Sequence, residues 1–161
     1  MPESSRLFVF TSDAFLSDDY SVTLIANVNA FLSSWAAHGT PLLADSTLIS
    51  NRVLVISLDE SAASASGCSI DSLTNFIKAE GASSGIDFFN RSWVLYRSPM
   101  EDQTNFTDNW TAELLNAFWA RRKAGLINDD TQVLNSTVTT LADARENLVQ
   151  VFSDSWHASM W

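Results

Sequence analysis

The stretch S-A-S-G-C-S-I-D, residues 64–71, contains the only cysteine of the chain, Cys68. It follows the apolar run V-L-V-I-S-L-D-E and precedes S-L-T-N-F-I, whose apolar residues have helical spacing. We therefore expect Cys68 on a tight loop between a strand and a helix, with Gly67 allowing the turn and Ser69 as the helix N-cap. Backbone N–H groups at a helix N-terminus favour a thiolate, a carboxylate or a phosphate. The stretch predicts either a reactive thiol or an anion pocket.

Two observations limit the reactive-thiol interpretation. A cysteine in a crowded turn is also typical of a small side chain that is simply packed. Asp71 suits the first turn of a helix, where the dipole favours a negative charge, but a carboxylate this close disfavours a thiolate.

A cysteine nucleophile needs a base, and the chain has two histidines. His38, in W-A-A-H-G, is predicted to end the first helix, where a histidine is also a common C-terminal cap. His157, in D-S-W-H, lies in a tail that also carries Trp156, and this tail is too apolar to be left loose, so we expect it to pack back on the body. Which histidine reaches Cys68 stays open.

Two acids, Asp59 and Glu60, close the strand just before the cysteine loop. Acids at a strand end often face a cleft, and a solvated turn is the alternative. The candidate catalytic residues are thus Cys68, His38 and His157, and the candidate ligand-binding residues are Asp59, Glu60, Gly67, Ser69, Asp71 and Trp156.

The elements that position these residues follow from hydrophobic spacing. Arg6–Ser12 is predicted as the first strand, and a helix follows from Asp18 to about Gly39, with Asp18 or Asp19 as its N-cap. Leu42–Ser50 and Arg52–Asp59 are predicted as an antiparallel pair joined by a tight turn at Asn51, and the second of these, the most apolar, as the central strand.

The second half of the chain is predicted from the same signals. A helix over residues 69–81 precedes a strand over 93–97, and another helix over about 114–123 has its basic residues in the last turn and stops at Gly125. Residues 131–139 are β-prone and residues 140–151 are predicted to form a short helix. The fold class is therefore α+β, with an antiparallel or mixed sheet of four or five strands packed by three or four helices.

Length and composition favour one domain over residues 1–161, with a possible long loop or subdomain boundary at 98–109. The formal net charge is -10, from nine basic and 19 acidic residues, which makes nucleic acid a poor partner. A single cysteine, no predicted secretory signal and no run of about 18 apolar residues favour a cytoplasmic protein without a membrane span.

Several nucleotide and metal motifs are missing from the sequence. A strand ending in Asp-Glu is similar to the metal-binding strand of P-loop ATPases, but G-x-x-x-x-G-K-[ST] and G-x-G-x-x-G are both absent. C-x-x-C and H-x-x-x-H are absent too. We therefore expect no ATPase activity, no cofactor and no structural metal.

Five pieces of the sequence resemble a family of small bacterial proteins, chiefly of the Bacteroidetes lineage. They are R-L-F-V-F-T-S, F-L-S-S-W-A-A-H-G, N-R-V-L-V-I-S-L-D-E, S-G-C-S-I-D-S-L-T-N-F-I and D-S-W-H. These proteins are often labelled "ABC transporter ATPase" although they lack the phosphate-binding loop. The resemblance spans residues 6–157. It draws attention to the residues on the matching pieces but implies no particular reaction. The chain departs from the family in its Ser/Ala-rich, lysine-poor surface and its Trp-bearing tail.

Three hypotheses follow. The first is a small cytoplasmic binding protein that holds an anionic ligand, or the acidic terminus of a partner, at the Gly67–Cys68–Ser69 turn. The second is a thiol enzyme with Cys68 as nucleophile and His38 or His157 as base. The third is a structural or interaction module, in which tryptophans of an apolar patch pair two chains into a homodimer.

Overall fold

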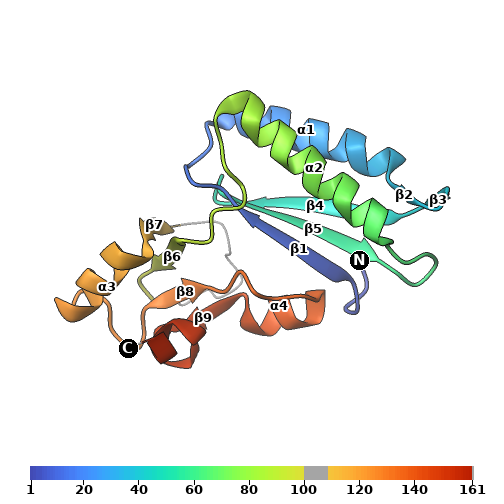
Figure 1. The fold of residues 1–161 in the computed structure, drawn as a ribbon. Coiled ribbons are helices and arrows are strands. Elements are labelled where there is room, and N and C mark those ends of the chain that lie inside the picture. The colour runs from blue at the N-terminus through green and yellow to red at the C-terminus, as the bar shows by residue number, and fades with distance from the viewer. Residues whose placement is uncertain (100–108, 161) are drawn as a thin grey trace.

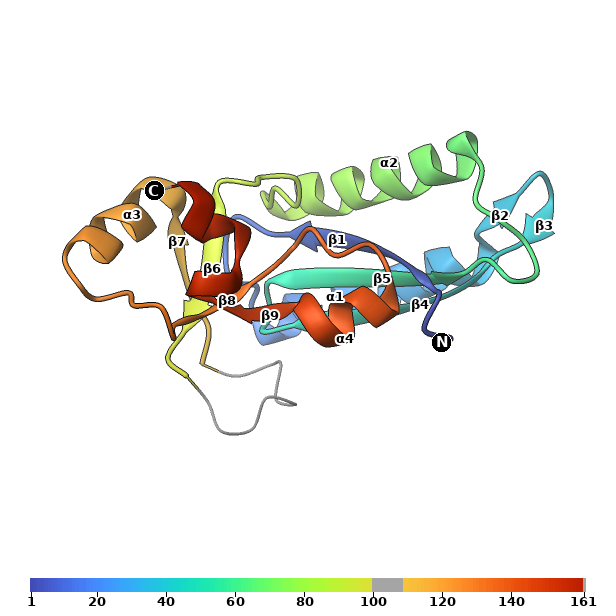
Figure 2. The same ribbon diagram turned by 90° about the horizontal axis from the view of Figure 1, so that it is seen from below.

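The computed structural model describes residues 1–99 and 109–160 and shows a layered α+β chain. Two long helices cover one face of a three-stranded antiparallel sheet of order β1-β5-β4, and the second half of the chain packs on the other face (Figures 1 and 2). The α+β prediction is confirmed. The elements of this first half are β1 (Arg6–Thr11), α1 (Asp18–Ser34), β2 (Ala36–Ala37), β3 (Thr40–Pro41), β4 (Leu43–Ile49), β5 (Val53–Asp59) and α2 (Gly67–Ser84).

The second half contains a four-stranded antiparallel sheet of order β7-β6-β8-β9. Within residues 1–99 and 109–160 the strands are thus divided among three antiparallel sheets, including the short β2–β3 ribbon, whereas the sequence predicts one. Strands β7 and β9 are too short to stand out in the hydrophobic pattern. The elements are β6 (Trp93–Arg97), β7 (Thr111–Leu114), α3 (Leu115–Lys123), β8 (Gln132–Leu134), α4 (Leu141–Asn147), β9 (Val149–Val151) and the 3-10 turns η1 (Phe152–Asp154) and η2 (Trp156–Met160).

The β4–β5 hairpin is built as the sequence predicts, with β5 at the centre of its sheet. Ser50 and Asn51 have φ angles of 54° and 51°, the left-handed pair of a type I′ turn, and Arg52 N donates to Ile49 O at 3.0 Å. This turn places Arg52 immediately before the first residue of the central strand.

Helix α1 differs from its prediction at both ends. Its N-cap is Ser17, whose side chain accepts from Tyr20 N, and the two predicted caps, Asp18 and Asp19, lie in the first turn instead. The helix ends at Ser34, so the prediction that His38 ends it is wrong. His38 lies in the β2–β3 turn with a φ of 51°, because the chain leaves the helix to form a short ribbon.

Helix α2 begins one turn earlier than predicted. Ser66 is its N-cap and forms a capping box with Ser69, so the prediction of Ser69 as the N-cap is wrong. The helix ends at Gly85, whose φ of 69° is the left-handed C-cap conformation that glycine adopts without strain.

One glycine of α2 is required by close packing. A Cβ on Gly81 would lie 2.3 Å from Ile86 O and 3.1 Å from Phe88 Cδ2. We expect Gly81→Ala to lower the free energy of unfolding by about 2 kcal/mol, because overpacking against a backbone oxygen outweighs the gain of about 1 kcal/mol in helix propensity. Urea unfolding measures it, with Gly67→Ala as the control, since a Cβ there meets no atom within 4 Å. Equal stability of the two variants would contradict the prediction.

In the second half, helix α3 is confirmed, with Arg121, Arg122 and Lys123 in its last turn and Gly125 at a φ of 76° beyond it. The predicted helix over residues 140–151 ends at Asn147, and β9 follows it. The segment 98–109 lies outside the described residues except for 98, 99 and 109, and the single-domain prediction stays a prediction.

In the part of the chain that the structure describes, three hydrophobic clusters hold these layers together. The first lies between the two long helices and the sheet, and the second joins the opposite face of that sheet to β6, β8 and α4. The third, around Phe118 and Phe152, packs α3 and the C-terminal turns on the second sheet. His157 is buried and Trp156 is 41% exposed, so the tail does pack back on the body, as predicted.

Candidate functional site

Most of the predicted site residues gather at the end of the first sheet where β5 stops and α2 starts. Asp59 and Glu60 close β5, and Gly67, Cys68, Ser69 and Asp71 form the first turns of α2. The β2–β3 turn, which carries His38, lies at the same end, and Trp35 next to β2 donates through Nε1 to Ser69 O at 2.8 Å. The other two residues, Trp156 and His157, are in η2 near the C-terminus, on the opposite side of the molecule (Figures 1 and 2).

Several backbone donors around the start of α2 are used by the chain itself, namely the amides of Ala65, Ser66 and Ser69. Ser69 N donates to Ser66 Oγ at 3.1 Å, and Ser66 N donates to Ser69 Oγ at 2.7 Å. Glu60 Oε1 accepts from Ala65 N at 3.0 Å, which fixes the loop before the helix. These bonds satisfy donors that an anion would otherwise take. The turn therefore offers an external anion less than the sequence suggests.

Gly67 does not make a sharp turn. It is the first residue of α2, and added side-chain atoms would meet open space there. The prediction that Gly67 allows a sharp turn beside Cys68 is therefore wrong, because the chain enters the helix through the extended N-cap Ser66.

Cys68 is exposed, so the alternative of a packed, buried cysteine is wrong. We expect iodoacetamide to modify Cys68 in the folded protein without denaturant, as measured by mass spectrometry over time. His157→Ala should leave the rate unchanged, because η2 lies on the other side of the molecule. A rate that falls with His38→Ala would instead support a Cys68–His38 pair.

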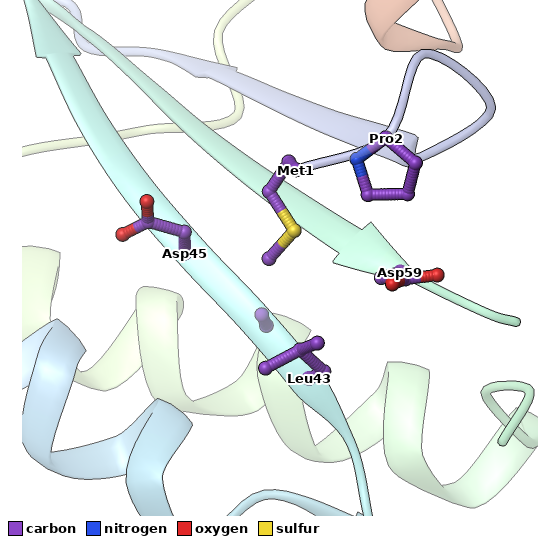
Figure 3. A pocket seen from close by; sticks show the side chains of 6 residues that line it. Met1, Pro2, Leu43, Asp45 and Asp59 are labelled. Atoms are coloured by element: carbon purple, nitrogen blue, oxygen red, sulfur yellow. The ribbon is translucent and has the colours of Figure 1, made fainter. Parts of the chain in front are cut away.

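A shallow groove of about 330 Å³ borders the same end of the sheet and includes one predicted residue, Asp59 (Figure 3). Met1, Pro2 and Leu43 line it with apolar atoms, and Asp45 lies across it from Asp59. A hydrogen bond from Ser61 holds the pKa of Asp59 below its usual value. The two carboxylates make this groove a poor place for an anion.

The sequence did not single out Arg52, at the opposite end of β5, about 20 Å away for a seven-residue strand. Its side chain is only 3% exposed. The guanidinium carbon lies 4.5 Å from the ring centroid of Phe15, in the β1–α1 loop, and 4.4 Å from that of Trp93, at the start of β6. Three segments far apart in the sequence thus meet around one buried cation.

The buried donors of this cluster lack acceptors. Within residues 1–99 and 109–160, Arg52 Nε, Arg52 Nη2 and the indole Nε1 of Trp93 are buried and have no hydrogen-bond partner. Burial lowers the pKa of Arg52, and the nearby Asp13 carboxylate partly offsets this. Asp13 is not a hydrogen-bond partner of either donor, and its Oδ1 accepts from Asp87 N at 3.0 Å. By contrast, the buried Arg97 donates through Nε to Gln132 Oε1 at 2.8 Å.

One signal for this cluster was present in the sequence. In N-R-V-L-V-I-S, an arginine immediately precedes the most apolar strand of the chain, where the neighbouring residues are expected to be buried. Because charged residues are almost never fully buried unless they are paired, an arginine at such a position needs a partner. What the sequence does not contain is the pairing of that arginine with Phe15 and Trp93.

The chain matches no protein-family model, no curated protein and no solved structure at a significant level. Over the described ranges, no helix is long and apolar enough to cross a membrane. Across the same residues, no three His, Cys, Asp or Glu side chains are grouped to hold a metal ion.

Proposed function

We propose that this chain is a small binding protein whose ligand or partner carries an anionic group, and that Arg52 takes up that group. The observation that supports the proposal is the buried guanidinium with two unpaired donors. The class of function is the one that the sequence suggests. The site moves from the Gly67–Cys68–Ser69 turn to Arg52, because the amide of Ser69 is already capped whereas the donors of Arg52 are not.

The free energies favour an external acceptor for Arg52. Removing a cation from water costs several kcal/mol even after relaxation, and each unsatisfied buried donor costs about 1–3 kcal/mol. A desolvated cation–π contact returns about 2 kcal/mol, and Arg52 makes two. The π contacts therefore do not cover the cost, and an anion on the free donors would.

Titration calorimetry with a small panel tests the proposal. Acetate, inorganic phosphate and a peptide with a free C-terminal carboxylate represent anions, and the amidated peptide and an alkylamine are the controls. We expect binding of at least one anion, no binding of the controls, and loss of binding in Arg52→Met. A peptide that binds where acetate does not would indicate a partner's terminus as the ligand. Anion binding that persists in Arg52→Met, or no binding by any anion, would refute the proposal.

Arg122→Met is the matched variant for this experiment. Arg122 also stacks on an aromatic ring, 4.8 Å from the centroid of Phe152, but its guanidinium donates to Asp129 Oδ1 and Ile127 O at 3.0 Å each. Because these donors already have acceptors, we expect Arg122→Met to bind anions as the unmodified protein does.

The thiol-enzyme hypothesis has less support. His157 is buried in η2, which lies on the opposite side of the molecule from the start of α2 (Figure 1), and His38 is exposed in a short turn. The alkylation experiment above addresses it, and light scattering addresses the predicted homodimer.

A further inference from the structure

The two unpaired atoms of Arg52 form one particular edge of its guanidinium. Nε–H and the Nη2–H bond beside it point the same way and make the side-on fork of the group. The spacing of this fork matches the two oxygens of a carboxylate, which it binds through two parallel hydrogen bonds. Trp93 Nε1 adds a third buried, unpaired donor in the same cluster. Three buried donors without an acceptor favour the binding of an oxyanion, whose oxygens accept hydrogen bonds.

We infer that the group held by Arg52 is a carboxylate, bound side-on through Nε and Nη2, and that the side chain of Phe15 is the gate that admits it. This inference rests on the function proposed above. It adds the chemical class of the ligand and the residue that controls its entry.

A carboxylate fits this place better than a phosphate for two reasons. The Phe15 and Trp93 rings lie over the guanidinium at 4.5 and 4.4 Å, so ligand atoms that extend out of the guanidinium plane approach these rings. The out-of-plane oxygens of a tetrahedral phosphate would meet the rings. A carboxylate also carries a single negative charge, whereas a phosphate monoester carries about -1.5 to -2 at neutral pH. The lower charge is repelled less by Asp13, which lies near Arg52.

Phe15 is the exposed side chain of the cluster. The donors of Arg52 are buried, so a ligand reaches them only if a neighbouring side chain is displaced. The Phe15 side chain is 49% exposed, while Trp93 belongs to a paired strand. The backbone on both sides of Phe15 is anchored: Ser12 Oγ donates to Ala14 O, and Leu16 N donates to Asn51 O at 2.8 Å. We infer that rotation of the Phe15 side chain, with its backbone held, is the movement that exposes the edge.

Binding measured with acetate, benzoate and inorganic phosphate, with acetamide and benzamide as neutral isosteres, tests the ligand class. The reporters are calorimetry and the NMR signals of Arg52 Nε–H and the Trp93 indole. We expect both carboxylates to bind and to shift both signals, the amides not to bind, and phosphate to bind at least tenfold more weakly. Arg52→Lys keeps the charge but lacks the fork, so its carboxylate affinity should fall at least tenfold. Phosphate binding as tight as acetate would overturn the assignment of a carboxylate while leaving the proposed function intact.

Two further variants test the gate and the local charge. In stopped-flow measurements of tryptophan fluorescence, Phe15→Ala should raise the association rate constant of benzoate at least tenfold, and an unchanged rate would overturn the gate. Asp13→Asn keeps the hydrogen bond to Asp87 N and removes the repulsion, so it should tighten carboxylate binding severalfold. If Asp13 itself occupies the fork in solution, Asp13→Asn would instead lower stability without tightening binding, and the inference would fail. Absence of binding by every anion would refute the proposed function as well.

Discussion

Between pH 6.5 and 4 the free energy of unfolding should fall by on the order of 3 kcal/mol as a result of one buried histidine. His157 is 3% exposed and stacks on Trp156 with 3.8 Å between ring centroids, and burial lowers its pKa from 6.5 to about 4. In this window the unfolded chain binds a proton that the folded chain does not, so stability decreases as the pH falls. Each unit of pKa difference corresponds to about 1.4 kcal/mol, and below about pH 4 this contribution levels off.

Urea unfolding at a series of pH values measures this effect. His157→Gln removes the titrating group, so its stability should vary less between pH 6.5 and 4 than that of the unmodified protein. His38→Gln is the matched control, since His38 is the other histidine and its side chain is exposed. A pH dependence that survives in His157→Gln and disappears in His38→Gln would contradict the assignment. Asp59, whose pKa is also lowered, contributes at more acidic pH.

Arg52→Met should leave the protein folded and raise its free energy of unfolding by about 1 kcal/mol while removing anion binding. Replacing a buried ion by an apolar side chain of similar length is often neutral or stabilising by 1–4 kcal/mol, and the loss of two cation–π contacts offsets part of the gain. For a chain of this size, 1 kcal/mol corresponds to an increase of about 2–4 °C in Tm. Stability gained together with binding lost is typical of a side chain kept for a ligand.

Differential scanning calorimetry of two arginine variants separates the two roles. Arg122→Met should lower Tm, because it breaks hydrogen bonds to Asp129 and to the carbonyl of Ile127. If Arg52→Met instead cost 3 kcal/mol or more, the Arg52 guanidinium would have an internal acceptor in solution. That result would favour a structural role and count against the proposed site.

The two predictions above depend on the burial of His157 and of Arg52. The sequence predicts the first of these better than the second. The tail of the chain was predicted to pack on the body from its apolar content, and His157 is buried as a consequence. The sequence predicts Arg52 as the first residue of the central strand but does not predict that its guanidinium is buried. Its two aromatic neighbours come from positions 15 and 93, which no local pattern connects.

The candidate site at the start of α2 shows the same difference. The sequence placed Cys68, Ser69 and Asp71 at a helix N-terminus correctly, because the apolar spacing and the small residues are local signals. The predicted N-cap, Ser69, lies one turn after the observed N-cap, Ser66, because both residues carry hydroxyls that can cap a helix. The hypothesis that His157 acts as the base for Cys68 depends on the distance between the two side chains, and the spacing of residues along the sequence does not predict that distance.

The sequence by itself determined the α+β class, the long helices, the β4–β5 hairpin with its turn at Asn51, and β5 as the central strand. These features depend on hydrophobic period and on turn residues, which act over a few neighbouring positions. Only the tertiary structure decided the division of the strands into three sheets, the exposure of Cys68 and the burial of Arg52. The physical reason is that burial and pairing are set by which faces meet in the folded chain, and those contacts join residues that lie far apart in sequence.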